Sequence, residues 1–397
     1  MRNRIYVDHA ATTAVRPQVA AAMAPFASER FGNPSSLHAL GRTAATAVDD
    51  ARALAAAVLN ARPGELIFTS GGSESINSAL KGVAFAQRLA GAGHRIVTTP
   101  IEHHAALHTC DYLERFGFEI AHVPVDAEGM VSPSAVVRAM DPDTALVNVM
   151  LANNEVGTLQ PIAEIAQAVR RRGAALDRRI PLHTDAVQAP GQLPLDVQAL
   201  DVDLLSLSAH KFGGPKGAGL LYLRRGTPFL PQQTGGGQER NRRAGTENVA
   251  GIVGLGAALD LAETERADFV RHTSALRDRL LRRALDEIPG AVRNGPASDR
   301  LPNNANIRFD GIDGQALLEA LDSAGIDASS GSACTTASWE PSHVLLAMGI
   351  DQDQAAGSLR CSFGLTNTPA DVDRIFTELA RIVSALRAGA PATPSTV

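Results

Sequence analysis

Short apolar runs alternate with helical stretches through the first half of the chain, and this alternation constrains the fold more than any other feature. The apolar or β-branched runs, which we interpret as strands, are residues 65–70, 95–99, 119–125, 145–151, 181–184 and 203–208. Segments with helical spacing, such as residues 75–89 and 162–172, lie between several of them. The pattern predicts an α/β fold with a large, mainly parallel, doubly wound sheet. Ligands of such sheets bind at the C-terminal ends of the strands.

The pattern changes near residue 251, where long helical segments begin. Short strands follow around residues 306–309 and 359–363. We interpret this part as a smaller α+β domain, and a chain of 397 residues is long enough for two such units. The predicted large domain is residues 15–260. The predicted small domain combines residues 1–14 with residues 261–397.

Composition excludes several classes of protein. The chain has 37 Lys and Arg against 42 Asp and Glu, and a net charge of -5 gives no basis for binding nucleic acid or anionic membranes. No apolar run of about 18 residues occurs, and no apolar signal region follows the polar N-terminus. The three cysteines are too few and too scattered for a disulfide framework. We therefore expect a cytoplasmic protein with free thiols.

Two ionisable residues stand at predicted strand ends. Lys211 follows the run 203–208 in the segment Ser208-Ala-His-Lys. Loss of hydration at a strand end lowers the pKa of an amine and suits a lysine that forms a Schiff base, although an exposed loop lysine is the alternative. Asp185 directly follows the run 181–184, at a strand end where a carboxylate can hold a cofactor's ring nitrogen protonated. A helix N-cap or a surface aspartate is the alternative for this residue.

Other segments suggest phosphate or ring contacts. Gly71, Gly72 and Ser73 separate a strand from a helix, so that backbone amides and hydroxyls form a ready phosphate site. The spacing of a nucleotide P-loop is absent from the sequence. His104 and His108 are four residues apart, but no third ligand is evident and we predict no metal site. A lid over a flat ring, or polar capping, is the better use for these histidines.

Cys334 lies in a segment rich in small polar residues. Seven of the ten residues from 329 to 338 are Ser, Thr or Gly, which predicts a mobile loop. A structural cysteine would be expected among aliphatic residues, as for Cys110, and Cys361 in an apparent strand is better explained by packing. Arg360 precedes it and has the forked donors that clamp a carboxylate, with a structural salt bridge as the alternative.

In this order the motifs resemble the NifS/IscS-type cysteine desulfurases, which are class V members of the pyridoxal-phosphate (PLP) enzymes of fold type I. The resemblance extends from Tyr6 to Phe363 and rests on these stretches: Asp8-His-Ala-Ala-Thr-Thr, Gly32-Asn-Pro-Ser-Ser-Leu-His, Phe68-Thr-Ser-Gly-Gly-Ser-Glu-Ser, Glu102-His, Asn153-Asn-Glu-Val-Gly, Asp185-Ala-Val-Gln, Ser208-Ala-His-Lys, Gly235-Gly-Gly-Gln-Glu-Arg, Arg243-Ala-Gly-Thr-Glu-Asn and Ser330-Gly-Ser-Ala-Cys-Thr.

The resemblance implies a role for each matching position. Lys211 would bind the cofactor covalently, His103 would stack on its ring, and Asp185 would pair with the ring nitrogen. The residues near the ring hydroxyl and the substrate would be Gln188 and Asn154. The residues that hold the phosphate would be Gly72, Ser73, Ser208 and His210, with Thr246 reaching the phosphate of a neighbouring subunit. The residues that bind the substrate carboxylate would be Arg360 and Asn33.

The implied reaction is the conversion of L-cysteine to L-alanine, with the sulfur held as a persulfide on Cys334. The implied partners are a second copy of the chain and an iron–sulfur scaffold or other sulfur acceptor, and Cys334 could transiently ligate a cluster. Gly72, Ser73, Ala209 and Cys361 depart from the commoner family pattern. A selenocysteine lyase or another class V aminotransferase is the alternative activity, and a sulfur-carrier or scaffold protein without cofactor is the alternative from another class.

Overall fold

A seven-stranded sheet organises the computed structural model, which describes residues 4–331 and 341–389. In the part of the chain that it describes, β8 alone runs antiparallel to its neighbours, and the other strands of this sheet are parallel. In spatial order the strands are β2 (Leu66–Thr69), β8 (Gly219–Leu223), β7 (Leu204–Ser208), β6 (Leu182–Asp185), β5 (Thr144–Asn148), β3 (Arg95–Thr98) and β4 (Glu119–His122).

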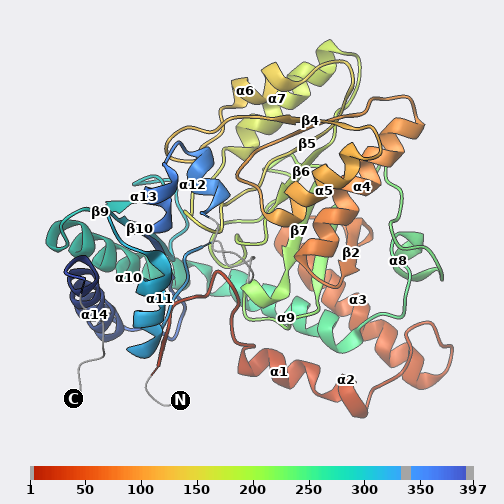
Figure 1. Ribbon diagram of the computed structural model, residues 1–397. Coiled ribbons are helices and arrows are strands. Elements are labelled where there is room, and N and C mark those ends of the chain that lie inside the picture. Colours follow the sequence, from red (N-terminus) through yellow and green to blue (C-terminus); the bar gives the residue numbers. More distant parts are fainter. Residues whose placement is uncertain (1–3, 332–340, 390–397) are drawn as a thin grey trace.

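Helices cover both faces of this sheet (Figure 1). Successive side chains of a strand point to opposite faces. Ile67 accordingly packs in the cluster under the first pair of helices, while Leu66 and Phe68 pack in the cluster under the second group. The first pair is α4 (Gly72–Leu89) and α5 (His104–Glu114). The second group is α1 (Pro17–Met23), α3 (Ala39–Leu59), α6 (Pro133–Ala139), α7 (Ile162–Ala175) and α9 (Val249–Thr264). Burial on both faces explains the continuous apolar runs of the sequence.

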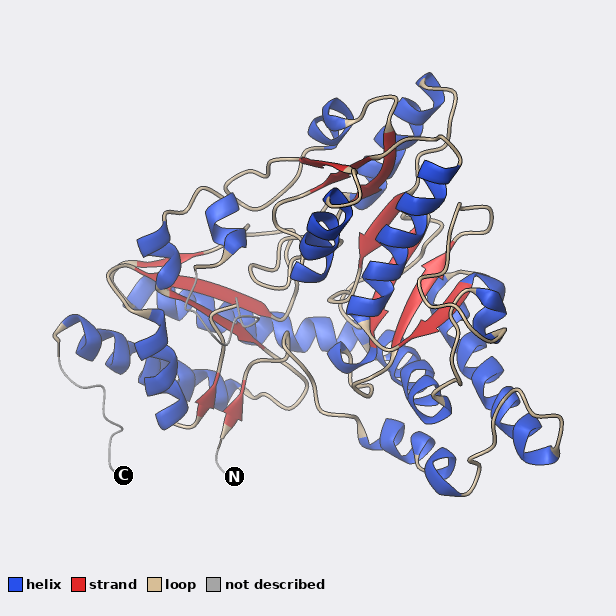
Figure 2. Cartoon of the chain, turned by 45° about the vertical axis from the view of Figure 1, so that its right-hand side comes forward, coloured by secondary structure: helices blue, strands red, loops and turns tan. Residues whose placement is uncertain are grey.

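A smaller unit lies beside the large sheet, with both ends of the described chain on its side of the molecule (Figure 2). Its strands are β12 (Ser358–Ser362), β10 (Asn304–Phe309) and β9 (Ala291–Arg293), with β1 (Ile5–Tyr6) paired in parallel to β11 (Ile326–Asp327). Its helices are α10 (Arg266–Glu287), α11 (Gly314–Ser323), α12 (His343–Ala347), α13 (Gln352–Ala356) and α14 (Pro369–Arg387). Ile5 and Val7 belong to its core, so the N-terminal segment packs with this unit.

Short elements complete the chain. These are α2 (Pro25–Ser28), α8 (Gln238–Asn241) and the 3-10 turns η1 (Pro63–Glu65) and η2 (Ala209–Lys211). No helix among the described residues is both long and apolar enough to cross a bilayer.

The structure confirms the predicted fold class, a large mainly parallel sheet with a smaller α+β part. All six expected strands of the large sheet are present, with ends that differ by a few residues at most. Strand β8 in this sheet was not predicted from the sequence, and neither were three short strands elsewhere, β1, β9 and β11. The domain boundary at residue 260 stays a prediction, and that residue lies within α9.

Candidate functional site

The strands of the large sheet end around a cavity of about 320 Å³. It lies at their C-terminal edge, where an α/β sheet binds ligands. The cavity is lined by ten of the thirteen residues predicted for the site: Gly72, Ser73, His103, Asn154, Asp185, Gln188, Ser208, His210, Lys211 and Arg360. Because these positions span almost 290 residues of sequence, the fold alone brings them together.

Lys211 is held at this edge by the turn η2, which directly follows β7. Its Nζ donates hydrogen bonds to the carbonyl oxygens of Ala10, at 2.7 Å, and Ala11, at 2.8 Å. Gln188 Nε2 donates to the same Ala10 oxygen at 3.0 Å. The N-terminal segment therefore forms one wall of the cavity and fixes the amine there. No role was predicted for Ala10 and Ala11, although both stand in the motif that begins at Asp8.

Asp185 ends β6 and faces the cavity from a buried position. Burial raises the pKa of its carboxyl group to about 6, against a hydrogen bond from the Val187 amide and the nearby charge of Lys211. Behind it, His183 bridges Asn148, at 2.6 Å, and Ser206, at 2.8 Å. Burial lowers the pKa of His183 to about 3, so this ring is a neutral support for the strand that carries Asp185.

His103 caps the start of α5, where its Nδ1 accepts a hydrogen bond from the Ala105 amide at 3.0 Å. Burial, and then the charge of Lys211, lower the pKa of His103 to about 4. A flat, neutral ring therefore borders the cavity at neutral pH. His104 instead packs its ring against those of His108 and His343. Within residues 4–331 and 341–389, no group of three or more His, Cys, Asp or Glu side chains could hold a metal ion.

The N-terminus of α4 forms the polar end of the cavity. This 18-residue helix begins at Gly72, where a Cβ atom would lie 2.9 Å from Val187 Cγ2 and 3.3 Å from Ser208 Cβ. Only a residue without a side chain lets the helix start come this close to the strand ends. Gly72 and Ser73 of the first turn line the cavity, and the unpaired amides of a helix start can bind a phosphate. Ser73, Ser208 and His210 add polar side chains to the same end.

Arg360 is buried in β12, with a side-chain exposure of 2%, and reaches the cavity from the smaller unit. Its Nη1 donates to the Asn154 carbonyl oxygen at 2.9 Å, and its Nη2 donates to Asp8 Oδ1 at 2.7 Å. Asp8 was given no role by the sequence analysis, although it opens a quoted motif. A buried guanidinium with one fixed carboxylate partner is oriented for a second carboxylate in the cavity.

Asn33 and Thr246 lie elsewhere. Both are exposed, and both line a second cavity, of about 240 Å³, together with Phe31. Neither lines the cavity of Lys211 within one chain. Their shared position is separate from the site that both were predicted to serve.

Cys334, the predicted sulfur carrier, lies outside the described residues. Cys110 and Cys361 are buried, and burial raises the pKa of both thiols to about 12. Neither forms a thiolate readily at neutral pH, and the thiolate is the nucleophilic form.

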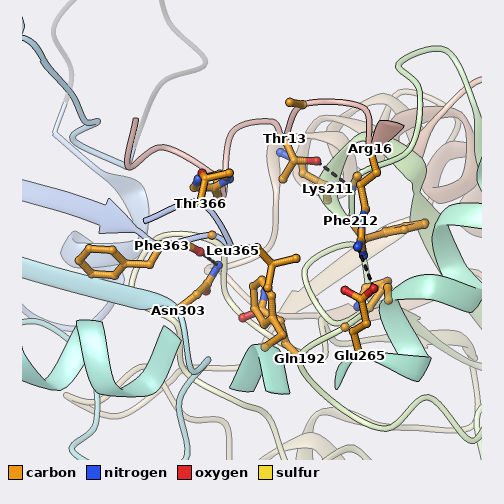
Figure 3. Close-up of a pocket in the computed structure, with 18 of the residues that line it drawn as sticks. Thr13, Arg16, Gln192, Lys211, Phe212, Glu265, Asn303, Phe363, Leu365 and Thr366 are labelled. Atoms are coloured by element: carbon orange, nitrogen blue, oxygen red, sulfur yellow. Dashed lines mark hydrogen bonds and ion pairs between the residues drawn. The ribbon is translucent and has the colours of Figure 1, made fainter. Parts of the chain in front are cut away.

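A third cavity, of about 270 Å³, lies next to the Lys211 turn (Figure 3). Its walls are largely apolar and include Phe212 and Phe363. Arg16 and Glu265, which form an ion pair at 2.8 Å, also line it. The Gly213 amide donates to the Thr13 hydroxyl at 2.8 Å, so the backbone after Lys211 is fixed from this side as well.

This combination of an α/β sheet, a lysine at a strand end and a buried aspartate is that of a PLP-binding domain. Residues 5–375 match the family described as Aminotransferase class-V, and the chain belongs to this family.

Two relatives and two solved structures show how close the similarity is. A protein named Cysteine desulfurase IscS from Methanosarcina thermophila is 50% identical over 98% of this chain and 94% of its own length. Another of the same name from Dictyoglomus turgidum is 47% identical over 98% of this chain and 97% of its own. The structure of a NifS-like protein matches with a TM-score of 0.89 at 40% identity, covering 96% of this chain and all of that one. DndA from Streptomyces lividans matches with a TM-score of 0.76 at 38% identity, covering 89% and 98%.

Proposed function

We propose that this chain is a PLP-dependent cysteine desulfurase that converts L-cysteine to L-alanine and holds the sulfur as a persulfide on Cys334. The observation that carries the proposal is one cavity that contains Lys211, the buried Asp185 and the buried Arg360. The relatives named cysteine desulfurase, matched over nearly the whole chain, support the same activity.

Residues of the cavity suit the cofactor at four points: its ring nitrogen, its ring face, its phosphate and the carbon that bonds to an amine. Asp185 offers a carboxylate to the ring nitrogen, and His103 offers a neutral flat ring as a stacking partner. The start of α4, packed closely at Gly72, suits the phosphate. Lys211 is the amine for the covalent bond. The bound cofactor would supply an electron sink for the negative charge that develops on the substrate Cα.

The residues of the chain perform the remaining steps. Arg360, oriented by Asp8, binds the substrate carboxylate and so fixes the Cα–H bond near Lys211. Lys211 Nζ takes the proton from Cα. The Cys334 thiolate then attacks the substrate sulfur, so that an S–S bond forms as the Cβ–S bond breaks. Cβ takes up a proton, Lys211 returns a proton to Cα, alanine leaves, and the persulfide remains for an acceptor.

We also propose that the chain acts as a homodimer. Asn33 and Thr246 share a cavity with exposed Phe31, and Leu37 nearby is 91% exposed. Exposed apolar side chains of this size around a polar cavity mark interaction surfaces. A second copy seated there would bring both residues to the neighbouring Lys211 cavity. We further propose the cytoplasm as the compartment and a scaffold protein for iron–sulfur clusters as the acceptor.

The test of the proposed function is the variant Cys334→Ala. It retains Lys211 and Arg360, so the purified protein should keep its cofactor and bind cysteine, yet release alanine at less than about a hundredth of the wild-type rate. The matched control is Cys361→Ala, which should release alanine normally because its thiol is buried. Wild-type alanine release by Cys334→Ala would contradict the persulfide step.

A further inference from the structure

Glu102 is completely buried at the turn after β3, next to His103. Its Oε1 accepts hydrogen bonds from the Thr99 hydroxyl, at 2.8 Å, and from the Met150 amide, at 2.9 Å. Its Oε2 is buried and has no hydrogen-bond partner among the described residues. A carboxylate that is buried without a neutralising cation costs far more free energy than a neutral carboxylic acid.

The position of Glu102 connects segments that form the cavity. Thr99 precedes it in the turn that carries His103, while Met150 lies in the loop that leads from β5 to Asn154. The backbone carbonyl of Glu102 also accepts a hydrogen bond from His343 Nε2 in α12, at 3.0 Å. One residue thus fastens the turn after β3 to the loop after β5 and to the smaller unit.

The charges around Glu102 disfavour a second negative charge. Desolvation raises the pKa of Glu102 to about 8 against the lowering effect of the Met150, Thr99 and Asn148 hydrogen-bond donors, and the carboxylate of Asp185 adds to the increase. On the other sides lie the Cys110 thiol of α5, the His103 imidazole and the His343 ring. The nearby Lys211 lowers the pKa of Asp185. Of the two buried carboxyl groups, Glu102 is therefore the one that keeps a proton.

We propose that Glu102 is a positioning residue: in the folded protein it carries a proton, and this neutral acid fastens the His103 turn to the cavity wall while Asp185 keeps the negative charge. This role deepens the proposed function, since His103 and Asp185 act on the cofactor there. Ionisation of Glu102 at alkaline pH would place two like charges in one buried region and weaken the turn.

The first experiment measures the thermal midpoint of the holoenzyme between pH 5 and pH 9 for the wild type and for Glu102→Gln. The pKa of Glu102 is about 8 in the folded protein, above the ordinary value of 4.5. The contribution of Glu102 to folding stability is therefore fully present below pH 4.5 and is lost as pH rises through 8. Glutamine cannot ionise. The midpoint of Glu102→Gln relative to wild type should therefore rise from pH 5 to pH 8 and then level off. A constant difference across this range would overturn the proposal.

The matched control is Glu65→Gln. Glu65 is also buried and accepts backbone amide hydrogen bonds, from Arg62 at 3.0 Å and Arg225 at 2.9 Å, but it does not line the cavity. The variant Glu65→Gln shows how the thermal midpoint changes when a buried glutamate outside the cavity is replaced by glutamine. If the midpoint of Glu65→Gln relative to wild type rises with pH as much as that of Glu102→Gln, the effect belongs to burial in general and the proposal is overturned.

A second measurement uses alanine release from cysteine. At pH 7, kcat of Glu102→Gln should be within about twofold of the wild-type kcat. Between pH 7 and pH 9, kcat should fall less in Glu102→Gln than in wild type. In Glu102→Ala, kcat should be lower than in wild type by about tenfold or more at both pH 7 and pH 9. A loss in Glu102→Gln as large as that in Glu102→Ala would show that the ionised form is needed. The thermal experiment does not depend on turnover, so it stands even if wild type releases no alanine and the proposed function fails.

Discussion

Lys211 and Asp185 differ in how the fold holds them, although both line the same cavity. Asp185 is buried at the end of β6, and its carboxyl group has few hydrogen-bond partners. Lys211 is only partly buried, and its amine contacts two backbone carbonyl groups of the N-terminal segment. This difference suits the proposed chemistry, in which the Lys211 amine must move while the Asp185 carboxylate keeps a fixed position.

Replacement of Lys211 by alanine tests the central residue. The proposed base and the covalent attachment are lost together, so kcat for alanine release should fall by at least about 10²–10⁴-fold. The free energy of unfolding should fall by only about 1–3 kcal/mol, since two backbone carbonyls lose their donor. Activity and circular dichroism measured on the same sample check both parts. Full desulfurase activity would show that Lys211 has no catalytic role.

The cysteines should differ strongly in reactivity. Burial raises the pKa of Cys110 and of Cys361 to about 12, so both remain protonated at pH 8 and are shielded from reagents. Brief treatment of the native protein with iodoacetamide should therefore modify Cys334 first. Peptide mass spectrometry identifies the modified residue. Earlier modification of Cys361 than of Cys334 would be inconsistent with its burial in β12.

At the scale of elements, the contact between α4 and the strand ends depends on Gly72. A Cβ atom there would lie 2.9 Å from Val187 and 3.3 Å from Ser208, so Gly72→Ala must push the helix start away from β7. Such overpacking costs about 1–3 kcal/mol, and we expect it to raise the Kd for pyridoxal phosphate about tenfold. Reconstitution of the cofactor-free protein, followed by absorbance, measures this Kd.

Gly64→Ala is the matched control. No atom lies within 4 Å of the position where its Cβ would stand, and the residue lies in η1 away from the cavity. Its Kd should equal that of wild type. Equal Kd values for Gly72→Ala and Gly64→Ala would show that the close approach of α4 is unimportant for cofactor binding.

The elements that the sequence predicted correctly are those with strong local patterns. The strands β2 and β5 are buried on both faces and therefore appear as continuous apolar runs. The strand β8 was missed although its residues are equally apolar, because it follows directly on the glycine-rich turn after Lys211. The short strands β9 and β11 have too few residues to show a period of two.

At the scale of the molecule, the contacts that the sequence analysis missed are those between distant segments. Arg360 was nominated as a carboxylate clamp, but its ion pair with Asp8 joins residues 352 positions apart and leaves no local pattern. The pKa of Glu102 is likewise raised by burial between distant segments, with a smaller contribution from Asp185 at the end of β6. The resemblance to a family supplied the positions of site residues, and packing supplies the partners that orient them.

The separate cavity of Asn33 and Thr246 leads to a prediction about the whole assembly. If each active site takes Lys211 from one chain and these two residues from the other, two inactive variants must complement each other. The variants are Lys211→Ala and the double variant Asn33→Ala/Thr246→Ala. Dimers that contain one chain of each have one site with both defects and one site with wild-type residues throughout.

Co-expression of the two variants with different affinity tags allows the mixed dimers to be isolated. Random pairing makes half of the dimers mixed, and each mixed dimer has one intact site, so the unfractionated mixture should release alanine at about a quarter of the wild-type rate. Each parent alone should be far less active. The purified mixed dimers should reach about half of the wild-type rate, because one of their two sites is intact. If mixed dimers are no more active than the mean of their parents, the residues act within one chain. A monomer with full activity in light scattering would exclude the shared site altogether, because Asn33 and Thr246 do not line the cavity of their own Lys211.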